Sequence, residues 1–195
     1  MKRKQLEMIL ERLEGFIRPS FKREQYATPA SVAAEMLFLA AMRGDLGTVC
    51  DLGCGTGTLA IGAALLGARA IGVEIDGDAL ATARKNADLL GADVDFIQAD
   101  VGHLSLSGID TVIMNPPFGA QKASAGDRVF LSKAIQMGKT VYSLHNRGSE
   151  AFIRSYIKPC VVQEVYRIPY PLKRSFEFHR QDVKVIEVEL YRITC

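Results

Sequence analysis

Short apolar segments alternate with helical patterns from residue 48 onward, and this alternation restricts the possible folds more than any other feature of the sequence. The predicted strands are residues 48–52, 69–74, 94–98, 111–114, 140–144, 161–168 and 183–191, and the predicted helices are residues 58–66, 77–90, 128–137 and 148–158. This order is typical of an α/β fold with a seven-stranded, mainly parallel, doubly wound sheet and helices on both faces. No helix separates the last two strands, so the last strand is expected to run antiparallel.

The part of the chain that precedes this alternation is predicted to be helical. Apolar residues recur at helical spacing between Leu6 and Leu13, which predicts an amphipathic helix over residues 2–14. Thr28 and Pro29 have the pattern of an N-cap followed by a proline at the first helical position, so a second helix is expected to run to Met42. A length of 195 residues favours one domain, residues 1–195, with residues 1–45 packing on the sheet as a helical segment.

The composition narrows the class of protein. With 48% hydrophobic and 24% charged residues, the chain has the make-up of a soluble globular enzyme. No apolar run reaches the roughly 18 residues that a membrane helix needs, and the N-terminus lacks a signal-peptide core. We therefore expect a cytoplasmic protein with no membrane contact. The cysteines form no C-x-x-C pair and have no histidine at zinc spacing, so small buried side chains and no metal site are expected.

The charge is distributed unevenly along the chain. Between Asp51 and Asp110 nine acidic residues face three basic ones, whereas basic residues dominate near both ends. Basic flanks around an acidic half suit a substrate that carries phosphates, such as a nucleic acid. The alternative is an ordinary solvated surface.

A glycine-rich loop and two acidic residues follow the first three predicted strands. Gly53, Gly55 and Gly57 have the spacing G-x-G-x-G, and Thr58 occupies the third position of the dinucleotide pattern, which makes a pyrophosphate site less favoured. Glu74 ends the second strand, where a carboxylate can accept from both ribose hydroxyls. Asp100 follows the third strand, where it can accept from an adenine amine. An acidic pocket suits a sulfonium, so we expect S-adenosylmethionine as the cofactor.

The fourth strand runs into Asn115-Pro116-Pro117-Phe118. Pro116 restricts Asn115 to an extended conformation, and the Asn115 side-chain oxygen and the Pro116 carbonyl can accept both hydrogens of one –NH₂ group. Such bonds strengthen as positive charge develops on the nitrogen, so they favour the transition state of methyl transfer. Phe118 offers a stacking face for an extruded base. An isolated Asn-Pro is a common turn signal, but here it follows a strand beside a cofactor-like loop.

Several substrates present such an amine. We expect an S-adenosylmethionine-dependent methyltransferase that acts on the N6 amine of an adenine in RNA. A DNA adenine and the amide of a protein glutamine are the alternatives, and an RNA-binding assembly protein regulated by the cofactor is the alternative without catalysis.

With these residues in view, the chain resembles the class I adenine-N6 methyltransferases, and most closely the family of methyltransferase-like protein 5 with its archaeal relatives. The resemblance spans almost the entire chain and includes Glu24-Gln25-Tyr26-x-Thr28, Asp51-Leu52-Gly53-Cys54-Gly55, Ile113-Met114-Asn115-Pro116-Pro117-Phe118-Gly119, Val141-Tyr142-Ser143-Leu144-His145 and Phe176-Glu177-Phe178-His179-Arg180. It implies a Rossmann-like class I methyltransferase fold. It also implies that the substrate is an adenine of small-subunit ribosomal RNA.

The resemblance assigns roles to individual residues. Those expected to bind the cofactor are Gln25, Thr28, Asp51, Gly53, Gly55, Thr56, Thr58, Glu74, Asp100 and Val101, and those expected to hold the target base are Asn115, Pro116, Pro117 and Phe118. Glu74 stands where an aspartate is common in the family. His145 and His179 remain open between structural roles and RNA contacts. Family members often pair the third strand, an expected sheet edge, with a small zinc-binding activator subunit, which is an expected partner here.

Overall fold

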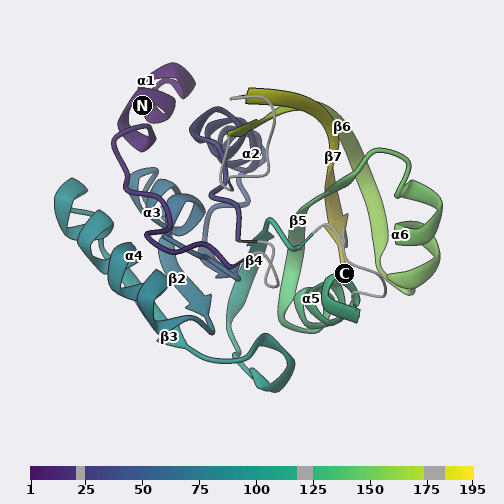
Figure 1. Cartoon of the computed structure of the whole chain (residues 1–195). Coiled ribbons are helices and arrows are strands. Elements are labelled where there is room, and N and C mark those ends of the chain that lie inside the picture. The colour runs from purple at the N-terminus through teal and green to yellow at the C-terminus, as the bar shows by residue number, and fades with distance from the viewer. Residues whose placement is uncertain (21–24, 118–124, 174–182) are drawn as a thin grey trace.

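The computed structural model describes residues 1–20, 25–117, 125–173 and 183–195 (Figure 1). Within these residues the elements are α1 (Arg3–Leu10), α2 (Ala30–Met42), β1 (Thr48–Leu52), α3 (Thr58–Leu65), β2 (Arg69–Glu74), α4 (Gly77–Leu90), β3 (Val94–Gln98), η2 (Val101–His103), β4 (Ile109–Met114), α5 (Ala125–Met137), β5 (Gly138–Asn146), α6 (Glu150–Tyr156), β6 (Val161–Lys173) and β7 (Val183–Thr194). None of the helices in this described part of the chain is long and apolar enough to span a membrane.

The strands form one seven-stranded sheet in the order β3-β2-β1-β4-β5-β7-β6. The pairs from β3 to β5 are parallel, and β7 is antiparallel to both of its neighbours. The predicted Rossmann-like fold with an antiparallel last strand is therefore confirmed. The strand order reverses between β1 and β4, and open α/β sheets bind ligands at the carboxyl ends of the strands at such a switch point.

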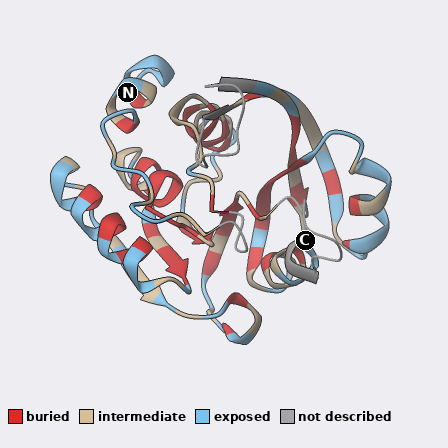
Figure 2. Ribbon diagram, in the orientation of Figure 1, coloured by how far each residue is buried: buried red, intermediate tan, exposed pale blue. Residues whose placement is uncertain are grey.

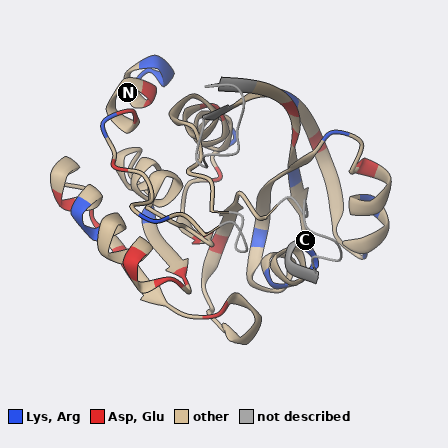
Figure 3. Ribbon diagram, viewed as in Figure 1, with Lys and Arg blue, Asp and Glu red and all other residues tan. Residues whose placement is uncertain are grey.

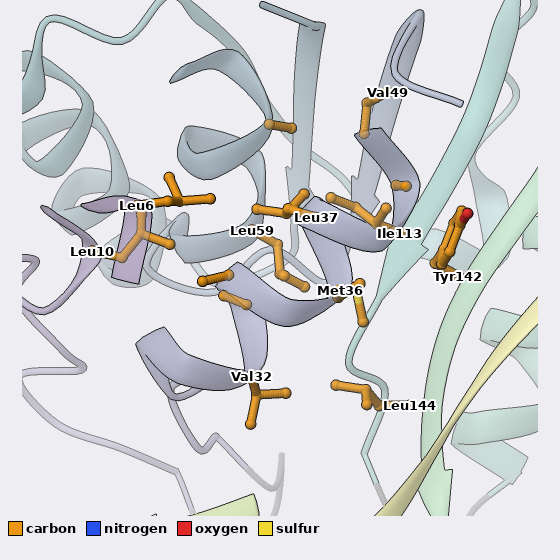
Figure 4. Packing of buried hydrophobic residues seen from close by; sticks show 14 of the residues in the cluster. Leu6, Leu10, Val32, Met36, Leu37, Val49, Leu59, Ile113, Tyr142 and Leu144 are labelled. Atoms are coloured by element: carbon orange, nitrogen blue, oxygen red, sulfur yellow. The ribbon is translucent and has the colours of Figure 1, made fainter. Parts of the chain in front are cut away.

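The core lies on both faces of this sheet (Figure 2). On one face, α2 and α3 pack against the strands and α1 packs against these two helices, and Leu6 and Leu37 join Val49 and Ile113 in one buried cluster (Figure 4). On the other face, residues of α5 and α6 pack against β1, β4, β5 and β7. The N-terminal helices thus share one core with the sheet: the apolar residues of α1 are buried against α2 and α3, and these two helices cover the strands.

Some boundaries differ from those expected. The first helix ends at Leu10, and residues 11–13 continue as a turn. Pro29, with φ −58° and ψ 140°, is the N-cap residue of α2, so the helix begins one residue later than predicted. Thr28 does not cap this helix, because its hydroxyl lies 3.0 Å from the side-chain nitrogen of Asn115 and accepts a hydrogen bond from it. A residue read as a helix cap is thus part of the candidate site.

The cysteine prediction was right for one pair and wrong for the other. Cys50 and Cys54 are free and buried. Cys160 and Cys195 form a disulfide across 35 residues of sequence. The pairing could not be predicted from the sequence, because the two cysteines are far apart in it. In the fold, Val161 at the start of β6 lies opposite Thr194 at the end of β7, and the cysteines next to these two residues therefore meet.

The disulfide is expected to stabilise the fold measurably. Changing both Cys160 and Cys195 to serine should lower the free energy of unfolding by about 2–4 kcal/mol, since the crosslink restricts the unfolded chain. For a chain of this size, that corresponds to a fall in Tm of roughly 5–15 °C. Thermal unfolding with and without a reductant checks this: reductant should lower the Tm of the wild type to that of the double variant and leave the variant unchanged. Equal Tm values for all four samples would contradict it.

Candidate active site

The loop after β1 turns tightly under the carboxyl end of the sheet. Gly53 and Gly55 have φ values of +71° and +53°, which side chains other than glycine rarely adopt. A Cβ atom added to Gly53 would lie 2.8 Å from the ring of Phe130, and one added to Gly55 would lie 2.7 Å from the ring of Phe16. Two aromatic rings therefore lie directly against this loop, and only glycine leaves room for them.

A cavity of about 410 Å³ opens above the loop. It collects most of the residues that the sequence assigned to the cofactor and the base from five separate parts of the chain. Those that line it are Gln25, Thr28, Gly53, Gly55, Thr56, Thr58, Glu74, Asp100, Val101, Asn115 and Pro117. The volume and the mixture of apolar and acidic walls fit an adenosine-containing sulfonium. Figure 3 shows acidic residues at the end of β2 and along α4, the side on which Glu74 lies.

Glu74 fixes the glycine loop from below. One carboxylate oxygen accepts from the backbone N–H of Gly55 at 3.0 Å, and the other accepts from the N–H groups of Ile75 and Asp76, each at 3.0 Å. The side chain is buried yet lines the cavity. Because each carboxylate oxygen has two lone pairs, the oxygen that accepts from Gly55 can still accept from one ribose hydroxyl while Glu74 holds the loop.

Asp51 was expected to bind the cofactor, but its side chain lies outside the cavity. It lies at the end of β1, 1% exposed, and does not line the cavity. One carboxylate oxygen accepts from the N–H of Ala60 in α3, and burial raises the pKa of Asp51 to about 8. Its position behind the loop indicates that it supports the start of α3, so direct contact with a ligand is not what the geometry favours.

Asp100 and Val101 line the cavity just after the end of β3. The Asp100 carboxylate accepts from the N–H of Gly102 at 2.8 Å and so caps the short helix η2. The Asp100 side chain is about half exposed, and Val101 is buried beside it. This arrangement presents one acidic edge and one apolar surface, which is what an adenine ring needs at its amine and its face.

Phe16 and residues 25–28, which lie between α1 and α2 in the sequence, line one side of the cavity. The Gln25 side chain accepts from the N–H of Ser20 at 2.7 Å and donates to the Asp76 carboxylate at 2.9 Å. Gln25 is thereby buried and ties the segment to the start of α4. Its polar atoms serve this tie, so its expected contact with the cofactor remains a prediction.

Asn115 lies at the centre of the candidate catalytic group. Its side-chain nitrogen donates to the hydroxyl of Thr28 at 3.0 Å and to that of Tyr170 at 2.9 Å. Its side-chain oxygen is buried and has no hydrogen-bond partner among the described residues. A buried acceptor without a donor costs free energy, so this oxygen is suited to receive a hydrogen from a ligand. Pro116 is buried next to it and is not among the residues that line the cavity, so the expected contact between its carbonyl and the amine remains a prediction.

Several site residues were not anticipated from the sequence. Phe16, Tyr26, Ile75, Ala99, Val129 and Phe130 line the cavity as well. Tyr170, from β6, lies outside the cavity wall and contacts Asn115 through its hydroxyl. Val129 and Phe130 belong to α5, which starts three residues earlier than predicted. An aromatic residue early in the helix that follows Asn-Pro-Pro is the sequence signal that could have pointed to Phe130.

Of the two histidines whose roles were left open, His145 and His179, the structure describes only His145. His145 is 5% exposed, and its Nε2 atom lies 2.6 Å from the Ser143 hydroxyl. Burial lowers the pKa of His145 to about 4, so this neutral ring has a structural role. Phe118 and His179 lie outside the described residues, and their assignments remain predictions. Within the described residues, no group of three or more His, Cys, Asp or Glu side chains is placed to hold a metal ion.

Comparisons with known proteins agree with this geometry. The family model described as "Methyltransferase small domain" matches residues 31–142. The rRNA N(6)-adenosine-methyltransferase Mettl5 of Drosophila melanogaster is 38% identical over 98% of this chain and 96% of its own length. An uncharacterised protein of Methanocaldococcus jannaschii is 40% identical over 99% of this chain and 94% of its own. The crystal structure of a candidate RNA methyltransferase from Pyrococcus horikoshii has a TM-score of 0.90 and 37% identity, and the match covers 100% of this chain and 98% of that one.

The matches extend over nearly the full length of these relatives, and the cavity has the walls that an adenosine-containing sulfonium needs. The chain therefore belongs to the Mettl5 family of S-adenosylmethionine-dependent methyltransferases.

Proposed function

We propose that this enzyme methylates the exocyclic N6 amine of an adenine in small-subunit ribosomal RNA. The observation that carries the proposal is the buried side-chain oxygen of Asn115, which lacks a donor among the described residues and belongs to a residue of the cofactor cavity. The –NH₂ group of adenine supplies the missing donor. The proposed unit of activity is the whole chain, residues 1–195, as one methyltransferase domain.

The chain's own residues would act on the nitrogen. The Asn115 oxygen accepts one amine hydrogen and the Pro116 carbonyl accepts the other, so the nitrogen is drawn toward tetrahedral geometry and its lone pair is localised. When bound, S-adenosylmethionine supplies an electrophilic methyl group. A nitrogen–carbon bond forms as the carbon–sulfur bond breaks, the electron pair stays on sulfur, and the nitrogen then loses one proton to water. Both acceptors bind more strongly as positive charge develops, which lowers the barrier.

The ribosomal substrate is supported by the relatives. The Drosophila protein carries the name of an rRNA N(6)-adenosine-methyltransferase and aligns with 98% of this chain, so the similarity covers the cavity and the elements around it. The choice of the small subunit rests on the family resemblance. We propose the cytoplasm as the place of action.

A partner subunit is part of the proposal. β3 pairs only with β2 and forms one edge of the sheet. The N–H of Ala99, one residue after β3, donates to the backbone carbonyl of Glu74 in β2. In a parallel strand, every second residue directs its backbone groups to the same neighbouring strand. The backbone groups of Val94, Phe96 and Gln98 therefore point to the open side of β3. β6, at the other edge, contains Pro169 and Pro171, which hinder pairing there. β3 contains no proline and is therefore the edge at which we propose that a small zinc-binding activator subunit adds a strand.

A substrate panel tests the proposal. The purified protein, with and without the activator subunit, is incubated with labelled S-adenosylmethionine and with small-subunit ribosomal RNA, duplex DNA or a glutamine-containing release-factor peptide. We expect label on N6-methyladenosine from the RNA alone, identified by mass spectrometry of nucleosides, and stronger labelling when the activator is present. Label confined to DNA, to the peptide or to another nucleoside would overturn the assignment, and equal labelling without the activator would remove the partner from it.

A further inference from the structure

We propose that Asn86 of α4 is a positioning residue for the cofactor: it ties the N-terminal segment, residues 14–20, to the glycine loop and so keeps Phe16 over that loop. Asn86 itself is not among the residues that line the cofactor cavity. The inference concerns the binding of S-adenosylmethionine. It therefore goes beyond the proposed methylation of adenine and holds whichever base receives the methyl group.

Asn86 is a polar residue on the buried face of α4. It follows Ala79 and Ala83 at helical spacing, and both of these alanines are buried. The Asn86 side chain is 1% exposed. Burial of an amide costs free energy unless its donors and its acceptor find partners. An asparagine at this position therefore indicates that the neighbouring chain segments supply such partners.

The Asn86 amide makes three hydrogen bonds to backbone groups, each 2.9 Å long. Its oxygen accepts from the N–H of Glu14, and its nitrogen donates to the carbonyl of Glu14 and to that of Thr56. A backbone N–H can only donate and a backbone carbonyl can only accept, so these partners fix the orientation of the amide. The three bonds join α4, the N-terminal segment and the glycine loop.

Both ends of this tie lead to the wall of the cofactor cavity. Thr56 lines the cavity, and so does Phe16, which follows Glu14 by two residues. The ring of Phe16 lies so close to Gly55 that a Cβ atom there would be 2.7 Å from it. The Asn86 side chain thus fixes the glycine loop relative to the segment that carries this ring.

The start of α4 holds the same segment at a second point. Gln25 accepts from the N–H of Ser20 and donates to the carboxylate of Asp76, the N-cap residue of α4. In the sequence, Phe16 lies between these two attachments. Attachment at both ends restricts the segment before the cofactor arrives, and a preorganised wall loses less conformational entropy on binding. Loss of the Asn86 amide releases one end, and the expected cost falls on the affinity for the cofactor.

The test is calorimetric titration of S-adenosylmethionine into the whole protein, which needs no nucleic acid. Asn86→Ala should raise the dissociation constant about tenfold, the size of effect that one ordinary hydrogen bond has. The matched control is Thr82→Ala, since Thr82 is also buried on α4 but its hydroxyl donates to the Asp78 carbonyl within the same helix. This control should leave the dissociation constant within about twofold of the wild type, because it changes neither attachment.

A double-mutant cycle with Phe16 separates positioning from packing. In a Phe16→Ala protein, Asn86→Ala should cost at most about threefold in affinity, because the ring that Asn86 positions is already absent. A packing defect would cost the same in both backgrounds. In a methylation assay, the KM for the cofactor should rise while kcat at saturating cofactor stays within about twofold. A partly unfolded protein would instead lose kcat.

Glu14→Pro tests the same tie from the other side and leaves the buried face of α4 unchanged. Proline has no backbone N–H, so this variant removes the bond to the Asn86 oxygen, whereas Glu14→Ala removes the same exposed side chain and keeps that bond. Glu14→Pro should raise the dissociation constant about fivefold relative to Glu14→Ala. This pair of variants decides the question even where Asn86→Ala fails to fold.

The outcomes separate two failures. Equal costs of Asn86→Ala with and without the Phe16 ring would overturn the positioning role, and so would equal affinities of Glu14→Pro and Glu14→Ala. A protein that shows the expected changes in cofactor affinity but methylates no adenine would overturn the proposed function and leave the role of Asn86 in place.

Discussion

Replacing Asn115 with alanine is expected to lower kcat/KM for adenine methylation by about 10²–10³-fold, the usual cost of losing a hydrogen-bonding group that acts mainly in the transition state. The buried oxygen of Asn115 has no donor of its own among the described residues, so its removal subtracts the acceptor that the amine needs. The measurement is a single-turnover rate of N6-methyladenosine formation in ribosomal RNA. Single-turnover conditions exclude product release as the limiting step.

The matching control is the affinity for S-adenosylmethionine. Asn115 lines the cavity at one point, whereas the glycine loop, Glu74 and Asp100 also line it and are expected to supply the other polar contacts to the cofactor. Calorimetry should therefore give a dissociation constant within about threefold of the wild type for Asn115→Ala. A rate within tenfold of the wild type, with the fold intact, would show that the amine finds its acceptor elsewhere and would refute the role of Asn115.

Much of this fold was predictable because local patterns and tertiary structure agree. The predicted boundaries of β1, β2, β3 and α4 match the structure residue for residue. Each of these strands is short and mainly apolar, and α4 is preceded by its N-cap Asp76, whose side chain accepts from two backbone N–H groups of the first turn. A strand followed by glycines and then directly by a helix is compatible with few other local structures. The position of the cavity at the end of the sheet could therefore be predicted from the sequence alone.

The parts that escaped prediction depend on contacts between distant residues. The sixth strand was expected to end at Ile168, because Pro169 and Pro171 ordinarily interrupt a strand; at the sheet edge they do not, and the strand continues through Tyr170. The hydrogen bond between Asn115 and the Tyr170 hydroxyl could therefore not be predicted from local sequence patterns. Asp51 is the converse case: it lies inside a recognised motif, yet its carboxylate accepts from Ala60 of α3 and does not line the cavity, so its expected contact with the cofactor remains a prediction.

Replacing Glu74 with alanine should raise the dissociation constant of S-adenosylmethionine by about 10²–10³-fold, since hydrogen bonds to a charged group contribute roughly 1.5–3 kcal/mol each. The carboxylate has two duties. It is expected to accept from a ribose hydroxyl, and it holds the backbone N–H groups of Gly55, Ile75 and Asp76 in place. Its loss therefore removes a ligand contact and loosens the loop that shapes the cavity. Calorimetric titration well below the melting temperature of the variant measures the effect.

Two further variants separate the duties of Glu74. Glu74→Asp keeps a carboxylate and should bind the cofactor within about tenfold of the wild type, since a shorter acid still reaches one of its partners. Asp88→Ala removes the same charge from the exposed face of α4 and should leave the affinity unchanged, which excludes a general electrostatic effect. If Glu74→Ala bound the cofactor within fivefold of the wild type, the carboxylate would be a loop support alone. The polar recognition of the ribose would then have to come from the N-terminal segment, where Gln25 and Thr28 already border the same cavity.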